Sequence, residues 1–185
     1  CWDNYHEFNK YFYDQIDFVS KLCAAAKNRL IVRLLADPRN KVWSEEARWY
    51  EYDKTLTVDL GLSPIEKKIS ESRLVIYSYD STGLLECLAL NIPVLAFWQN
   101  EFEHVRESAR PWYEILHDAG IIHLSSQSLA NHVNLIWNDV ESWWSSPAVQ
   151  EARIGFCSRY AKSIADPVFN LKSAVERAVM VSKPS

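Results

Sequence analysis

The sequence has few glycines, and they do not form either of two common nucleotide-binding motifs. Only 4 of the 185 residues are glycine, and neither a G-x-G-x-x-G nor a G-K-[ST] pattern is present. A dinucleotide-binding turn and a P-loop both need such glycines, because the backbone must come close to the phosphates. The sequence therefore excludes these two classes of nucleotide-binding protein.

Other absences narrow the function further. The 4 cysteines form no C-x-x-C pair, and the histidines lack the spacing of metal ligands, so we expect no metal and no cofactor. The net charge is −4 with both signs mixed, which gives no basic surface for nucleic acid. The longest charge-free apolar run, residues 87–100, is too short to span a bilayer. We expect a cytoplasmic protein, with peripheral attachment to the inner face of the membrane left open.

Length and composition bound the number of domains. A chain of 185 residues that is 48% hydrophobic can fill one domain but not two. The chain starts at Cys1 without a methionine, which suggests a fragment of a longer protein. We therefore expect residues 1–185 to form a single domain.

The most informative stretch, residues 73–98, predicts a strand, a turn, a helix and a second strand. Residues 73–79 and 94–98 are short, apolar and rich in β-branched or aromatic residues, as buried strands are. The helical run 84–90 lies between them, and Asn91 can end it before Pro93 stops the helix.

The rest of the chain repeats this alternation of strands and helices. Further strands are predicted at 30–36, 55–60 and 121–124, and helices at 4–26, 44–52, 64–70, 101–119, 126–137 and 149–165 and from Pro167 onward. In the last helix we expect Val168, Leu171 and Val175 to face inward. Alternation of this kind predicts an α/β, Rossmann-like, three-layer domain with a parallel sheet and helices on both faces.

The turn of the central stretch is the candidate binding site. Ser81 and Thr82 lie where a strand ends and a helix begins, so unpaired N–H groups and the helix dipole can attract an anion. Gly83 allows a ligand to approach the backbone, and Glu86 lies one turn deeper on the same helix face as Thr82. This arrangement suits a phosphate followed by a ribose diol. The alternative is a β-α-β unit with a polar turn that binds nothing.

Two further polar residues follow the next strand. Gln99 and Asn100 come directly after residues 94–98, and carboxyl ends of parallel strands meet at one edge of the sheet. They either border the same crevice as Ser81 or are ordinary loop residues.

The stretch resembles the donor-site motif in the C-terminal domain of GT-B glycosyltransferases. In that motif a Ser/Thr/Gly turn precedes a helix whose Glu holds the nucleotide ribose, and Ser81, Thr82, Gly83 and Glu86 fall on those positions. Two sequence segments are most similar to transferases of bacterial surface-polysaccharide clusters. They are YDSTGLLECLALNIPVLAFW and, further downstream, ESARPWY. The resemblance runs from about residue 29 to residue 160. It departs from the commoner pattern in having Asn91 where Gly is usual, and in lacking a Gly-rich turn near the domain start.

The resemblance implies a donor-binding half of an enzyme that takes a nucleotide sugar as donor and a glycan as acceptor. The N-terminal acceptor domain, which usually supplies the general base, would be absent. A basic residue near the end of the first strand would face the donor phosphates, and Arg33 is the candidate, with Arg39 as competitor. Arg33 would neutralise charge on the leaving phosphate. From the strand alone, a single arginine such as Arg33 is more often an ion-paired or snorkelling residue than a ligand contact.

Three other functions were weighed. The first is transfer of a polyol phosphate, as in teichoic-acid polymerases, which have a similar turn and helix. The second is a non-catalytic Rossmann-like binding or assembly module. The sequence from Tyr79 to Gly83 imitates the nucleophile elbow of hydrolases, with His117 or His123 to complete a triad. Tyr79 stands where that strained elbow needs glycine, so hydrolysis is not favoured.

An isolated half-enzyme should also expose aromatic surface that its partner domain would cover. The candidates lie beside turns or chain ends, and they are Trp2, Tyr5, Trp43, Trp98 and Trp112.

Overall fold

The computed structural model describes residues 5–36, 43–98, 101–162 and 165–181. Its strands are β1 (Ile31–Arg33), β2 (Thr57–Asp59), β3 (Val75–Tyr77), β4 (Val94–Phe97) and β5 (Ile122–His123). Its helices are α1 (Tyr5–Ser20), α2 (Ala24–Lys27), α4 (Glu45–Tyr52), α5 (Ile65–Ser70), α6 (Thr82–Ala89), α7 (Arg110–Asp118), α8 (Ser126–Ile136), α9 (Val140–Trp144), α10 (Pro147–Tyr160) and α11 (Pro167–Val181). None of these described helices is long and apolar enough to cross a membrane.

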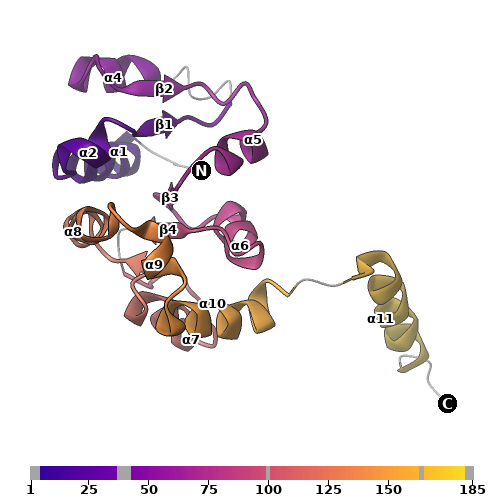
Figure 1. Ribbon diagram of the computed structural model, residues 1–185. Helices are drawn as coiled ribbons and strands as arrows, with labels where there is room; N and C mark the ends of the chain where they lie inside the picture. Colours follow the sequence, from indigo (N-terminus) through magenta and orange to yellow (C-terminus); the bar gives the residue numbers. More distant parts are fainter. Residues whose placement is uncertain (1–4, 37–42, 99–100, 163–164, 182–185) are drawn as a thin grey trace.

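All the recorded strand pairs are parallel, as the alternation of strands and helices predicted. β1 pairs with β2, and β4 lies between β3 and β5. In Figure 1 the strands follow one another down the view in the order β2, β1, β3, β4. The described strands thus form two parallel sheets, one of two strands (β1 and β2) and one of three (β3, β4 and β5).

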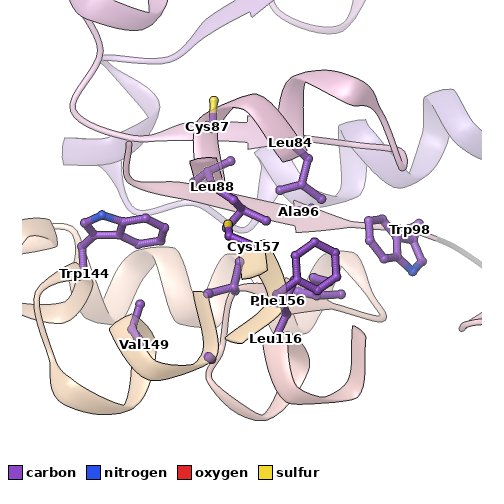
Figure 2. Close-up of a cluster of buried hydrophobic side chains, with 14 of the residues drawn as sticks. Leu84, Cys87, Leu88, Ala96, Trp98, Leu116, Trp144, Val149, Phe156 and Cys157 are labelled. Atoms are coloured by element: carbon purple, nitrogen blue, oxygen red, sulfur yellow. The ribbon is translucent and has the colours of Figure 1, made fainter. Parts of the chain in front are cut away.

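Helices cover both faces of the sheet, and the side chains of β4 show this directly. Val94 and Ala96 belong to one buried cluster with residues of α6, α7, α9 and α10. Leu95 and Phe97 belong to a second cluster with residues of α1, α4 and α8. Figure 2 shows part of the first cluster, with Trp144 and Trp98 at its opposite ends. The expected α/β fold with helices around parallel strands is confirmed.

Asn91 ends α6 in the way that its sequence position predicted. It has a φ of 58°, in the left-handed region, and the N–H of Ile92 donates to the carbonyl of Cys87 at 2.9 Å. Glycine is usual at such a position. The Asn91 side chain also makes a contact that glycine could not make, because the indole Nε1 of Trp144 donates to its Oδ1 at 3.0 Å.

Two expectations about helices were wrong. Residues 101–109 form turns rather than the first half of a helix, and α7 begins at Arg110. Pro111 lies in its first turn, where a missing N–H costs nothing. In α11 the side chains of Val168, Leu171 and Val175 are exposed rather than inward, and this helix stands apart from the others in Figure 1. Helical periodicity marks an apolar face but does not supply a surface for it to pack against.

The expected aromatic surface is only partly present. Tyr5 is 54% exposed, whereas Trp98 is only 4% exposed. Trp43 and Trp112 are half-buried, and Trp2 lies outside the described residues. Trp98 was a wrong choice because the turns after β4 fold back over it: its ring centroid lies 5.3 Å from that of His104.

Two histidines contact each other at the edge of the sheet: His123 in β5 is buried and His132 in α8 is half-buried. The ring nitrogens of His123 lie 2.9 Å from Ser128 Oγ and 3.1 Å from the carbonyl oxygen of Gly120, and the ring centroid of His132 is 5.0 Å away. Burial, with a smaller effect of His132, lowers the pKa of His123 to about 4. Burial also lowers the pKa of His132. The folded state therefore favours neutral rings.

The unfolding free energy should fall between pH 7 and pH 5, because the unfolded chain binds protons at histidine that the folded chain does not. For His123 alone the loss is roughly 1–2 kcal/mol, since its folded pKa is about 4 and the unfolded value is about 6.5. Urea titrations at pH 7, 6 and 5 measure it. His123→Gln is the control, because it keeps the contribution of the carboxylates. Equal pH dependence in the two proteins would contradict the assignment.

Candidate functional site

The start of α6 lies at the carboxyl end of β3 and has an unsatisfied hydroxyl. Ser81 takes the N-cap position with extended backbone (φ −139°, ψ 157°), and its carbonyl accepts from the N–H of Leu84 at 3.1 Å. Its side chain makes no capping bond, and Ser81 Oγ is buried without a hydrogen-bond partner among the described residues. A buried hydroxyl in this state is costly. It is poised to bond a ligand or water.

Thr82 and Glu86 occupy the exposed side of α6. Both are exposed, and they lie four residues apart and hence on one helix face. The first N–H groups of any helix lack partners within it, so the three residues from Ser81 to Gly83 also offer backbone donors. Side-chain hydroxyls, backbone donors and a carboxylate are thus available along one edge of the helix.

Packing against Tyr77 explains why residue 83 is glycine, which the sequence alone did not reveal. A Cβ at this position would lie 2.3 Å from the hydroxyl oxygen of Tyr77 and 2.6 Å from its Cζ. The Tyr77 ring therefore lies directly against the first turn of α6. Burial raises the pKa of this tyrosine. Close approach of a ligand to Gly83 stays a prediction.

Arg33 is tied to the other sheet. It ends β1, its Nη1 lies 2.6 Å from Asp59 Oδ2 in β2, and its Nη2 donates to the carbonyl of Ser63. The ion-paired reading of this residue is thus present in the structure, and its role on a leaving phosphate stays a prediction. Arg39 lies outside the described residues, as do Gln99 and Asn100.

Trp98 marks the carboxyl end of β4, one residue before Gln99. Its ring lies at the end of the buried cluster in Figure 2. Its Nε1 is buried and has no hydrogen-bond partner among the described residues. A second orphaned polar atom thus lies at the same edge of the sheet as Ser81 Oγ.

A group of polar side chains gathers around Trp98. His104 Nε2 lies 3.5 Å from Asp80 Oδ2, and the hydroxyl of Tyr113 donates to the same oxygen at 3.3 Å. The Tyr113 and Trp98 ring centroids are 6.0 Å apart. Burial, and after it the Asp80 carboxylate, raises the pKa of Tyr113. The hydroxyl therefore stays protonated and serves as a donor.

A cavity of about 220 Å³ opens at the same edge of the sheet. It is lined by Phe97 and Trp98 at the end of β4, by Leu124 after β5, by Ser125 at the start of α8, and by residues of α1. Sites for small ligands are typically about 300–1,000 Å³. This cavity is therefore large enough for one part of a nucleotide sugar and too small for the whole.

Ser81 Oγ has no hydrogen-bond partner among the described residues, so it is not paired with a described histidine as a triad requires. His117 lies 3.3 Å from Asp118, and both ring nitrogens of His123 are occupied by Ser128 and Gly120. Among the described residues, no group of three or more His, Cys, Asp and Glu side chains could hold a metal ion.

Sequence reasoning missed Asp80, His104, Tyr113 and Trp98 as members of one group. A signal was nevertheless available. Asp80 follows β3 and His104 follows β4, and these neighbouring parallel strands end at one edge.

Together, the parallel strands and the helices packed around them define an α/β protein. The model of the LIC12162 family transferase matches residues 1–174. The chain therefore belongs to the LIC12162 family of transferases. A search of curated proteins found no match.

Gly83→Ala should destabilise the fold by roughly 1–3 kcal/mol, because the new methyl group overlaps the Tyr77 ring and shifts α6. Adding Tyr77→Phe removes the nearest oxygen, so the double variant should recover part of the loss. Thermal unfolding measures both.

Gly155→Ala is the matched control for this prediction. Gly155 lies inside α10, and a Cβ there would meet no atom within 4 Å, so alanine should stabilise by roughly 0.5–1 kcal/mol. Equal effects at the two glycines would show that Tyr77 does not restrict position 83.

Proposed function

We propose that this chain is the donor-binding half of a GT-B glycosyltransferase, which transfers a sugar from a nucleotide sugar to a bacterial surface-polysaccharide acceptor. The observation that carries the proposal is the buried, unpartnered hydroxyl of Ser81 at the first turn of a helix that follows a central parallel strand. A phosphate at this place would satisfy that hydroxyl and would meet the positive end of the helix dipole.

The roles of the residues follow from their positions. Ser81, Thr82 and the backbone at Gly83 would bond the donor phosphates, and the exposed Glu86 would accept from the ribose hydroxyls one turn along. Gln99 and Asn100 would border the same crevice from the end of β4. The cavity of about 220 Å³ at the end of β4, which is not lined by Ser81, Thr82, Gly83 or Glu86, would take the sugar ring.

In the transfer step, an oxygen of the acceptor hydroxyl forms a bond to the anomeric carbon of the sugar. The bond from that carbon to the donor phosphate breaks, and its electron pair stays on the leaving nucleotide. The acceptor proton goes to a general base, which in this proposal belongs to the second, acceptor-binding domain. The part described here therefore contributes donor binding and stabilisation of the leaving phosphate.

Replacing Ser81 and Thr82 together by Ala should weaken nucleotide binding by roughly 1–3 kcal/mol, because charge-assisted hydrogen bonds to phosphate are lost. Calorimetric titration of the chain with UDP, GDP, CDP and CMP measures this. Glu86→Gln should weaken binding of the same nucleotide, since an amide is a poorer acceptor for the ribose hydroxyls.

The matched control is Ser70→Ala with Ser72→Ala. Both serines are exposed, and each hydroxyl bonds only a carbonyl of α5, so affinity should not change. Unchanged affinity in the Ser81/Thr82 variant would place the phosphate site elsewhere. Absence of binding by all four nucleotides would favour a non-catalytic assembly module. A preference for CMP would favour polyol-phosphate transfer, because CMP is what a CDP-activated polyol leaves behind.

A further inference from the structure

We propose that the imidazole of His104, held by Asp80, is the cationic group that contacts the donor phosphate at the start of α6. This inference rests on the proposed function, because it names the positive charge at the same phosphate site. It assigns a binding role to a residue in the turns after β4, a segment that sequence reasoning read as ordinary helix.

The need for a cation comes from the donor itself. A nucleotide sugar carries negative phosphates, and a helix start supplies only about half an elementary charge. The basic residue expected for the task, Arg33, is already bonded to Asp59 in β2 and to the carbonyl of Ser63. A cation directly beside α6 would supply the charge without breaking these bonds.

The position of His104 fits this need. Asp80 directly precedes Ser81 in the chain, and His104 Nε2 lies 3.5 Å from the Asp80 carboxylate. The imidazole is therefore beside the first turn of α6, although 24 positions separate Asp80 from His104 in the sequence. Its side chain is 40% exposed, so a ligand can reach the ring.

The supporting contacts fix the position of the ring. Asp80 also accepts a hydrogen bond from Tyr113 at 3.3 Å, so it has a neutral donor and a titratable partner on one oxygen. The buried ring of Trp98 lies edge to face with the imidazole, and its Nε1 is unpartnered among the described residues. The Trp98 ring thus gives the imidazole a fixed neighbour.

The Asp80 carboxylate determines the charge balance at this place. Asp80 alone would repel a phosphate at the neighbouring turn. When His104 is protonated, the pair is neutral, and the nitrogen that does not face Asp80 can donate to the phosphate. The titratable group that faces His104 is Asp80, which precedes α6, and Tyr113 in α7 faces Asp80. The segment of His104 itself adds Glu101, Glu103, Arg106 and Glu107.

Affinity for a nucleotide sugar should therefore rise as the pH falls. The probes are UDP-glucose, GDP-mannose and CDP-glycerol, whose phosphates are diesters and lack the second ionisation near pH 6 of a monoester. From pH 8 to pH 6 the affinity of the wild-type chain should rise about five-fold. His104→Gln should bind about ten-fold more weakly at pH 6, the effect of one charge-assisted bond, and should lose the pH dependence.

Arg106→Gln is the matched control. It removes one positive charge from an exposed side chain of the same segment, so it should change affinity less than two-fold. An equal loss in both variants would overturn the inference, because general electrostatic attraction would then explain it.

A double variant separates contact from neutralisation. If His104 only cancels the charge of Asp80, Asp80→Asn with His104→Gln should bind as tightly as the wild-type chain, and the inference fails. If the imidazole contacts the phosphate, the double variant should stay weak. Proton NMR adds a direct readout, since the ring resonances of His104, assigned with the His104→Gln spectrum, should shift on addition of UDP-glucose.

The test also distinguishes this inference from the proposed function. Binding that Ser81→Ala with Thr82→Ala weakens and His104→Gln does not would overturn only the role of His104. Absence of binding by all three probes to the wild-type chain would overturn both.

Discussion

Burial of β4 on both of its faces is the constraint on which the rest of the structure depends. Every residue from Val94 to Phe97 is buried, and alternate side chains enter different clusters. A strand of this kind needs a helical layer on each face and a neighbour on each edge. The polar groups of the chain can then approach the middle of the sheet only where its strands end. This is why Asp80, Ser81 and His104 gather at one edge.

Packing holds both ends of α6, the helix that precedes β4, in place. The connection between α6 and β4 passes through Asn91, whose left-handed backbone and bond to Trp144 end the helix at one place. At the other end Gly83 allows Tyr77 to lie against the first turn. With both ends held by packing, the orphaned Ser81 hydroxyl cannot relax into a partner. Unsatisfied groups held by a rigid frame are expected at binding sites rather than in ordinary turns.

The sequence predicted the strands, turns and helix ends that neighbouring residues determine. It did not predict the contacts between residues that lie far apart in the chain. The five strands, the turn at Ser81 and the end of α6 at Asn91 follow from patterns within a few residues, and all are present. The start of α7 was misplaced because Pro111 can begin a helix as well as kink one. The partner of Arg33 lies 26 positions away and that of His104 lies 24 away. The register of β1 and β2 brings Arg33 to Asp59, and the path of the turns after β4 brings His104 to Asp80.

The energies of the two candidate cations decide between them as ligands of a phosphate. Arg33 would have to give up charge-assisted bonds to Asp59 and Ser63, each worth about 1.5–3 kcal/mol. His104 is 40% exposed and holds Asp80 at 3.5 Å, a pair of the kind that contributes about 0–1 kcal/mol. Turning toward a phosphate therefore costs His104 little, and it need not leave Asp80 because its other nitrogen is available. The residue that is weakly held beside the helix start is thus better suited to the ligand than the arginine that the sheet already uses.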